Sequence, residues 1–264
     1  MSSEAIMRLG IFLAIFIAVG LAEIFAPRRA KLGTWKERWV ANLSILVLDV
    51  VIQRATVGAV ALLAAVWALN NDFGLFRVFD LHWLIAGVLG FLLLDFAIYV
   101  QHVVTHKVPI LWRLHRVHHA DEDVDLTTGL RFHPIEIILS ALYKAVIVLA
   151  LGLEPWVVLL FEAVLNASAV YTHGNLALPE KLDRLLRFLF CTPDMHRVHH
   201  SVIRAETDSN YGFFLSIWDR AFGTYRQAPA LGQMGVEIGL SDIRGAGTRN
   251  LLRMLIMPFR NRNF

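Results

Sequence analysis

The chain has 264 residues, of which 56% are apolar and 18% charged, and its mean hydropathy is +0.55. Soluble domains average about 45–50% apolar and about 25% charged residues, so this composition excludes a disordered chain and disfavours an ordinary soluble domain. The single cysteine, Cys191, excludes an internal disulfide framework and a thiolate-rich zinc site, and the net charge of +3 suits an anionic bilayer surface better than nucleic acid.

Five apolar stretches are long enough to be membrane spans. They cover residues 5–26, 40–69, 81–104, 134–151 and 156–171. We interpret the first as a retained span because it has neither a basic leader nor a small-residue cleavage site. The second is long for one crossing and contains Asp49 and Arg54, so part of it should face protein or extend past the hydrocarbon. The last two, separated by Glu154 and Pro155, are also compatible with a hairpin that does not fully cross.

Lysine and arginine residues fall in alternate loops, which predicts an orientation. Residues 27–39 contain five of them, residues 107–133 contain four and the tail after His173 contains twelve, whereas residues 70–80 contain only Arg77. Five crossings with the amino terminus outside would place every basic loop and the C-terminus in the cytoplasm. The same arrangement would place every histidine cluster on the cytoplasmic side.

The composition changes along the chain and predicts three regions. We expect N-terminal membrane spans over residues 1–93, a histidine-rich region over residues 94–225 and a basic amphipathic tail over residues 226–264. In the tail, apolar residues from Leu251 to Phe259 lie among arginines that include Arg249 and Arg262. This pattern predicts an interfacial amphipathic helix, and a short packed helix is an equal alternative.

Three clusters contain most of the eleven histidines. His102 and His106 are four residues apart, which places both imidazoles on one face of a helix. The sequence HRVHH occurs twice, at residues 115–119 and 196–200. On a helix, adjacent histidines diverge by about 100°, so each HRVHH can give two ligands to one metal ion and one to a neighbouring ion. Eight imidazoles exceed a closed four-ligand zinc site, which makes two metal ions the economical number.

Imidazole suits zinc, copper, iron and nickel, so spacing alone does not identify the metal. A site where the bilayer meets the cytoplasm can receive an insoluble chain from one side and oxygen and electrons from the other, which favours an iron pair. Two alternatives remain at this level. A non-catalytic metal-binding or transport protein should have ionisable residues along a membrane path, and a dizinc hydrolase should have a carboxylate base beside an open metal position.

Six segments resemble the fatty acid hydroxylase/sterol desaturase superfamily of integral-membrane non-haem di-iron enzymes. They are HVVTH at 102–106, HRVHH at 115–119, LRFHPIE at 130–136, YTHGN at 171–175, TPDMHRVHH at 192–200 and NYGFFLSIWDRAFGTY at 210–225. The resemblance implies an all-α membrane bundle of four to five spans with a cytoplasmic histidine-rich cap, in which residues 94–225 form the catalytic domain. It implies oxygen-dependent hydroxylation or desaturation of an unactivated C–H bond in a lipid, with a separate protein as electron donor and no nucleic-acid partner.

The resemblance also implies nine metal ligands for two iron ions, which zinc can replace in purified protein. They are His102, His106, His115, His118, His119, His173, His196, His199 and His200. His133 is either a tenth ligand or a residue that supports a ligand. His82 should lie at the opposite membrane face.

A metal-bound histidine usually donates its other ring N–H to a carboxylate, an amide or a carbonyl group. Asp95 and Asn166 rank first as such partners, because a polar side chain within a span is costly unless it is paired. Further candidates are Asp121, Glu136, Asn175, Asp194, Asp208 and Asn210, although the loop acids could simply be solvated. Residues 218–225, which include Trp218 and Asp219, are interpreted as a structural anchor and turn.

The sequence contains no G-x-G-x-x-G fingerprint for a dinucleotide, which agrees with an external electron donor. Five arginines could form a basic docking face for an acidic donor: Arg113, Arg116, Arg184, Arg187 and Arg197. The simpler alternative is that these charges face lipid headgroups.

Overall fold

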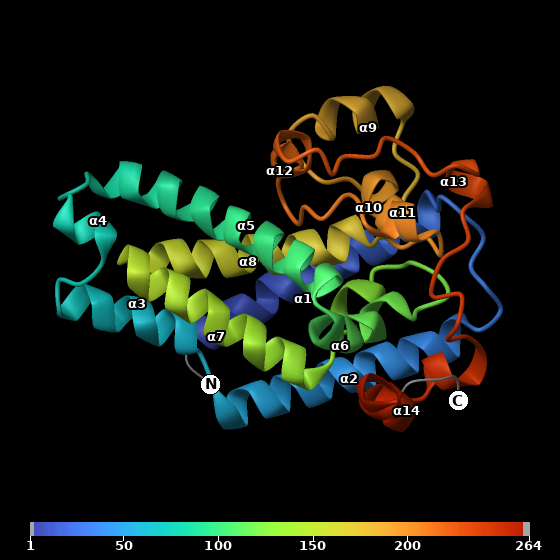
Figure 1. Ribbon diagram of the computed structural model, residues 1–264, viewed down its shortest axis with the longest axis horizontal. Coiled ribbons are helices and arrows are strands. Elements are labelled where there is room, and N and C mark those ends of the chain that lie inside the picture. Colours follow the sequence, from blue (N-terminus) through green and yellow to red (C-terminus); the bar gives the residue numbers. More distant parts are fainter. Residues whose placement is uncertain (1–2, 261–264) are drawn as a thin grey trace.

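The protein is a bundle of long helices with a cap of short helices and loops at one end (Figure 1). The computed structural model describes residues 3–260, with side chains from residue 9 onward. The bundle helices are α1 (Ser3–Phe25), α2 (Trp35–Thr56), α3 (Val60–Asn70), α4 (Leu75–Val78), α5 (Trp83–Lys107), α7 (Pro134–Leu151) and α8 (Pro155–Thr172). Within residues 3–260, β structure is limited to isolated bridges. The predicted all-α class is therefore confirmed.

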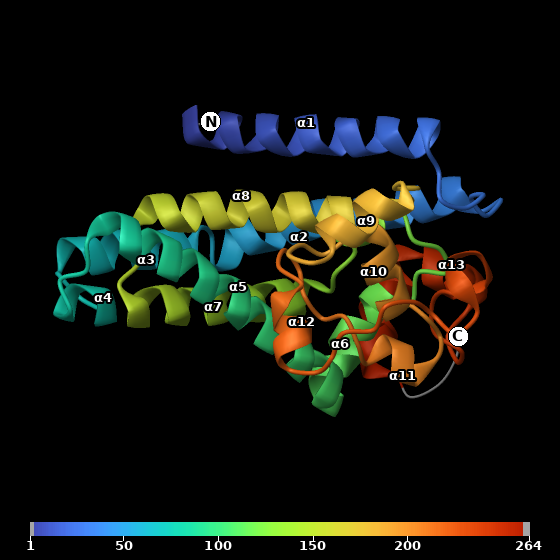
Figure 2. The ribbon, with the colours of Figure 1, turned by 90° about the horizontal axis from the view of Figure 1, so that it is seen from above.

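The bundle has the length and surface of a multi-pass membrane protein. Trp35–Val78, α5, α7 and α8 are long and apolar enough to cross a membrane, and Leu9–Phe25 is a shorter apolar stretch. Figure 2 shows α1 as an outer layer along α8. Large apolar side chains such as Val47, Leu63 and Val146 point outward from the bundle. A surface of this kind is stable in lipid and costly in water.

The long second apolar stretch is two helices, α2 and α3, rather than one. Gly58 separates them with a φ of +54°, a left-handed conformation that glycine adopts at no steric cost. The first half of α2 lies against the cap, where Arg38 and Asn42 are completely buried. The expectation that part of this stretch faces protein is therefore confirmed, and its extra length is explained by packing against the cap.

The turn between α7 and α8 lies at the end of the bundle away from the cap. Gly152 ends α7 in the left-handed conformation, and Pro155 occupies the first turn of α8. A Cβ atom on Gly74 would lie 2.3 Å from Cα of Gly152, so this turn contacts the α3–α4 loop backbone to backbone. Each of these helices has 18 residues, or about 27 Å, against a hydrocarbon thickness of about 30 Å. Both are long enough for a full crossing.

The core of the bundle joins α3, α5, α7 and α8. Small residues such as Ala61 and Ala65 on α3 let the helices approach closely, and Leu94, Val148 and Phe161 fill the space between them. These side chains fix the direction in which α5 and α8 leave the bundle. Both helices end at the cap, which positions the residues at their C-terminal ends.

The cap is built from short helices between long loops. They are α6 (Pro109–His119), α9 (Glu180–Leu186), α10 (Pro193–His199), α11 (Arg204–Thr207), α12 (Ile217–Ala221), α13 (Gly232–Gly235) and α14 (Leu251–Ile256), with 3-10 turns at Thr128–Leu130, Gly245–Arg249 and Met257–Phe259. The tail packs on α2 and α6 through Met254 and Met257, while Leu252 and Phe259 face outward. One side of this segment is thus packed, as the packed-helix alternative predicts, and apolar side chains remain exposed on the other. Arg262 lies outside the described residues.

Candidate metal centre

Four helices deliver histidines to one point at the junction of bundle and cap. His102 and His106 lie on the last two turns of α5, and His173 follows the last residue of α8. Helix α6 begins at Pro109 after the extended residue Val108, which turns the chain sharply after α5. Helix α10 begins at Pro193, with the side chain of its N-cap residue Thr192 accepting a backbone hydrogen bond.

Nine histidines form two adjacent groups. The five-histidine group is His102, His106, His115, His119 and His199, and the four-histidine group is His118, His173, His196 and His200. Within each group one nitrogen atom from every ring lies within 4.8 Å of the others, and all nine side chains are buried. Each HRVHH segment divides between the groups, two rings to one and one to the other, as its helical spacing predicts.

The Nε2 atoms face one another inside each group. In the four-histidine group, Nε2 of His173 lies 3.1 Å from Nε2 of His118, 3.0 Å from that of His196 and 3.1 Å from that of His200. In the five-histidine group, Nε2 of His102 and Nε2 of His115 are 3.2 Å apart. Two such nitrogens form a hydrogen bond only if one of them carries a proton and the other has a free lone pair.

The Nδ1 atoms of five rings point to hydrogen-bond acceptors, which fixes the tautomers of those five. Backbone carbonyls accept from four of the rings: Tyr211 from His102 at 2.7 Å, Arg131 from His118 at 3.2 Å, Ala169 from His173 at 2.7 Å and Ser209 from His199 at 2.7 Å. A neutral imidazole with its proton on Nδ1 has a lone pair on Nε2. The facing Nε2 atoms of His118 and His173 therefore present two lone pairs to each other, an arrangement that a cation between them would stabilise.

Burial keeps six of these imidazoles neutral. It lowers the pKa of His118, His119, His196 and His200 well below the ordinary value, and neighbouring imidazoles lower them further. Burial lowers the pKa of His173 to about 4 and that of His199 to about 3. Neutral imidazole is the form that binds metal ions. The two groups are thus sets of neutral nitrogens that could hold metal ions, rather than a charged patch.

Two carboxylates lie against the five-histidine group. Oε1 of Glu136 is 2.6 Å from Nδ1 of His115, and Oδ1 of Asp208 is 3.5 Å from Nδ1 of His106. Glu136 is in the first turn of α7, so its position follows from the helix start at Pro134. The expectation that Glu136 contacts a ligand histidine agrees with this geometry.

The two intramembrane candidates do not contact an imidazole. Oδ2 of Asp95 accepts from Nε1 of Trp218 at 2.8 Å and from the backbone of Leu215, so Asp95 connects α5 to the cap. Asn166 is exposed and lines a groove between α1 and α8. The prediction that these residues support ligands is wrong because the rotation of each helix directs them to other neighbours.

Three loop candidates connect segments of the cap instead of orienting rings. Asn175 exchanges two hydrogen bonds with the backbone of Arg29, and Asp194 pairs with Arg28 and Arg197. Asn210 bonds the backbone of Met195 and of Arg226. None of these three side chains has an imidazole partner among its hydrogen bonds.

The remaining two histidines lie apart from the groups. His133 caps α7: its Nδ1 accepts from the backbone of Ile135, and its Nε2 donates to the carbonyl of Leu255 at 3.1 Å. Both ring nitrogens are therefore used, and His133 is in neither group. His82 is the N-cap of α5 at the far end of the bundle, as the sequence predicts.

Sequence reasoning missed the role of the segment around Asn210. Asn210 has a φ of +53°, and the carbonyls on either side of it, Ser209 and Tyr211, accept from His199 and His102. Asp219 is completely buried and accepts from the backbone N–H groups of Tyr211 and Gly212 at 2.8 and 2.9 Å. The available signal was an asparagine before Tyr-Gly, because asparagine tolerates the left-handed conformation.

Aromatic rings cover the centre, and sequence reasoning did not single them out. Phe132 stacks on His118 with ring centroids 4.5 Å apart and an interplanar angle of 6°. Trp112 lies against His106 and His119, with centroid distances of 4.9 and 5.3 Å. Trp112 also lines a surface cavity of about 190 Å³. These rings separate the imidazoles from solvent.

The five arginines predicted as a docking face do not form one. Arg187 and Arg197 are buried in ion pairs with Asp183 and Asp194, and Arg184 pairs with Glu180 on the surface. Arg113 and Arg116 donate to backbone carbonyls of the C-terminal segment, such as those of Pro258 and Met257. Arg113, Arg116, Arg187 and Arg197 are thus used for contacts within the cap, and of the five only Arg184 has its ion pair on the surface.

The sequence was compared with known proteins. Residues 87–224 match the model of the fatty acid hydroxylase family. The chain is 31% identical to an ornithine lipid hydroxylase of Rhizobium tropici (65% of this chain, 50% of that protein) and 33% identical to the human alkylglycerol monooxygenase (57% and 33%). It is 29% identical to the rat cholesterol 25-hydroxylase (57% and 50%). The chain thus spans half or less of the length of these relatives. No solved structure matches it.

Proposed function

Because the chain belongs to the fatty acid hydroxylase family, we propose that it hydroxylates an unactivated C–H bond of a membrane lipid with O₂ at a centre of two iron ions. The relatives are hydroxylases and monooxygenases that their names connect with lipids, which favours hydroxylation over desaturation. The overall reaction R–H + O₂ + 2e⁻ + 2H⁺ → R–OH + H₂O balances with two electrons from a separate donor protein.

The observation that carries the proposal is the convergence of Nε2 lone pairs. His118 faces His173, and His102 faces His115, at distances where neutral rings of this tautomer repel. Nε2 atoms of three more rings, His106, His119 and His199, are buried without any partner. Unpaired buried nitrogens are costly unless an ion binds them. The residues therefore fit two metal ions.

The five-histidine group would hold one ion and the four-histidine group the other. Iron in these positions would supply the activation of oxygen that the reaction needs. The protein holds five of the rings by an Nδ1 hydrogen bond, and in His115 the acceptor is the Glu136 carboxylate. Phe132 and Trp112 exclude water from the rings.

We further propose that the centre faces the cytoplasm. The basic segment around Arg28, the α5–α6 corner and the C-terminal region all lie at the cap end of the bundle (Figure 1), and basic segments favour the cytoplasmic side. An external electron-donor protein would approach the centre from this side. The lipid substrate would enter from the side of the bundle.

Labelled dioxygen tests the function. The protein is purified without oxygen, loaded with Fe(II), reconstituted with lipid extract and a chemical reductant, and exposed to ¹⁸O₂. We expect about two iron equivalents per chain and one ¹⁸O atom in an alcohol product, whereas His196→Ala should hold about one equivalent and form no product. Product oxygen derived from water would indicate a hydrolase, and metal binding without oxygen uptake would indicate a binding or transport protein.

A further inference from the structure

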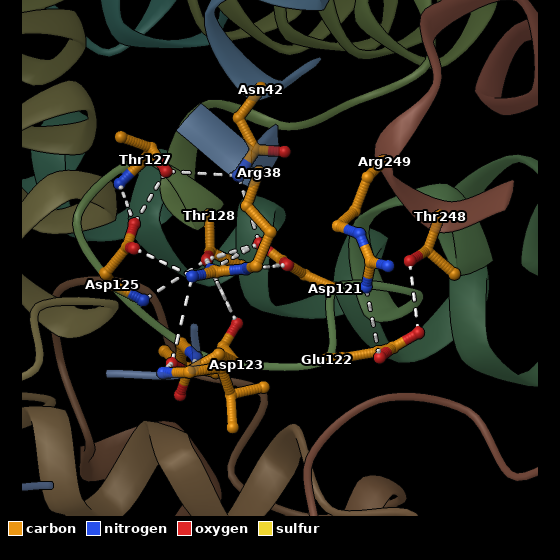
Figure 3. A network of polar contacts seen from close by, with 12 residues as sticks. Arg38, Asn42, Asp121, Glu122, Asp123, Asp125, Thr127, Thr128, Thr248 and Arg249 are labelled. Carbon is orange, nitrogen blue, oxygen red and sulfur yellow. Dashed lines mark hydrogen bonds and ion pairs between the residues drawn. The ribbon is translucent and has the colours of Figure 1, made fainter. Parts of the chain in front are cut away.

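Helix α2 enters the cap with a buried arginine and a buried asparagine (Figure 3). The Arg38 guanidinium contacts both oxygens of Asp121, with Nε at 2.5 Å from Oδ1 and Nη2 at 2.9 Å from Oδ2. Its Nη1 donates to Asp125 at 2.9 Å. Bidentate pairing of this kind fixes the orientation of the Asp121 carboxylate as well as its distance from Arg38. Asp121 is only two residues beyond His119, so Arg38 anchors the chain directly after the HRVHH helix α6.

Asn42, one turn further along α2, contacts both ends of the same loop, residues 121–131. Its Nδ2 donates to Asp121 and to Thr127, both at 3.0 Å. Its Oδ1 accepts from Nη1 of Arg131 at 3.1 Å. Asn42 thus uses both N–H donors and the carbonyl acceptor of its amide together.

The same loop contacts two histidines of the four-histidine group, His118 and His173. Nε of Arg131 donates to the carbonyl of Val117 on α6, and the carbonyl of Arg131 accepts from Nδ1 of His118. At Gly129, a Cβ atom would lie 2.3 Å from the carbonyl oxygen of Ala169 and 3.1 Å from Nδ1 of His173. The loop therefore packs on α8 beside His173, with no room for a side chain.

From this geometry we infer that Asn42 and Arg38 are positioning residues for the four-histidine group. By holding residues 121–131 in place, they fix the orientation of the His118 ring and the position of the His173 ring. The inference rests on the proposed metal centre and extends it, because α2 precedes the family match that begins at residue 87. Partners beyond the ligands typically change metal affinity about 10–100-fold.

Two variants test the inference. Asn42→Leu removes the contacts to Asp121 and Arg131 at similar volume, and Arg131→Met removes the guanidinium but keeps an unbranched side chain. Glu37→Gln is the matched control, since Glu37 is on the same helix turn but exposed, and its carboxylate pairs with Arg249. Each protein is titrated with Fe(II), and with Co(II) as a coloured probe, while its helix content and Tm are recorded.

We expect one of two metal equivalents to bind about 10–100-fold more weakly in both variants, with the other unchanged and the helical fold retained. Adding Asn42→Leu to His196→Ala, which already lacks a ligand of the four-histidine group, should remove nothing further. If Asn42→Leu fails to fold, Arg131→Met decides.

Wild-type affinity for both equivalents in the folded variants would overturn the inference, as would loss of the last metal in the double variant. A wild-type protein that binds no metal would instead overturn the proposed function. The two failures are therefore distinguished by the wild-type titration alone.

Discussion

Oε1 of Glu136 lies 2.6 Å from Nδ1 of His115, so a carboxylate at the start of α7 accepts from an imidazole of the five-histidine group. The other four Nδ1 hydrogen bonds described above end on neutral backbone carbonyls. A charged acceptor strengthens the hydrogen bond and raises the basicity of the ring toward a metal ion. This hydrogen bond distinguishes His115 from the four histidines whose Nδ1 groups donate to backbone carbonyls.

Glu136→Gln should lower the affinity for one of the two metal equivalents by about 10-fold, because an amide oxygen can still accept the hydrogen bond but carries no charge. Competition with a chelator measures the affinity. Glu180→Gln, which changes an exposed carboxylate in an ion pair with Arg184, is the control. Equal affinities in wild type and Glu136→Gln would show that the charge has no effect on His115.

His173→Ala and His133→Ala should behave differently. The first removes a ring whose Nε2 faces three others, so the protein should hold less than its full iron content and be inactive. The second removes a helix cap, which costs about 0.5–2 kcal/mol of stability and leaves the metal in place. Metal analysis and Tm of both variants test this assignment, and the reverse pattern of iron content would refute it.

Asp219→Asn should destabilise the cap by about 1–3 kcal/mol, since an amide N–H₂ would then face a backbone N–H now bound by a carboxylate oxygen. Because the Tyr211 carbonyl accepts from His102, the variant should also bind one metal ion more weakly. Chemical denaturation measures the loss of stability, and metal titration of the same variant measures the loss of affinity. Asp72→Asn, in the loop at the far end of the bundle, should change neither.

The metal-free protein should lose stability as the pH falls below about 6.5. Burial lowers the pKa of His173 to about 4 and of His199 to about 3, so the unfolded chain binds more protons than the folded chain below the ordinary imidazole pKa. Each such group contributes up to about 1.4 kcal/mol per pH unit in that window. Tm between pH 7.5 and 5 measures the effect. His82→Ala should leave the slope unchanged, and a flat profile would contradict burial of neutral rings.

A reporter fused after Asn71 should be detected outside the cell, and one fused to the C-terminal end should be detected inside. The basis is the asymmetry of lysine and arginine between the loops. A cytoplasmic signal at Asn71 would contradict five crossings and invert the proposed sidedness of the histidines.

The sequence by itself determined most of the long apolar helices and which clustered histidines share a helix face, because both depend on local spacing. Apolar stretches of about 20 residues predict spans, and intervals of three and four residues predict which rings share a helix face. The division of each HRVHH between two metal positions follows from the same geometry. Proline and glycine at positions such as Pro109 and Gly152 mark helix boundaries for local steric reasons.

Only the tertiary structure decided what holds the rings in place. Every residue has a carbonyl, so no residue type marks Tyr211 or Ser209 as an imidazole acceptor, and the choice depends on how distant segments pack. The rotation of whole helices directs Asp95 to Trp218 and Asn166 away from the centre. In the same way Arg38 is only one of several basic residues in the sequence, and it becomes the anchor of the 121–131 loop because α2 folds against the cap.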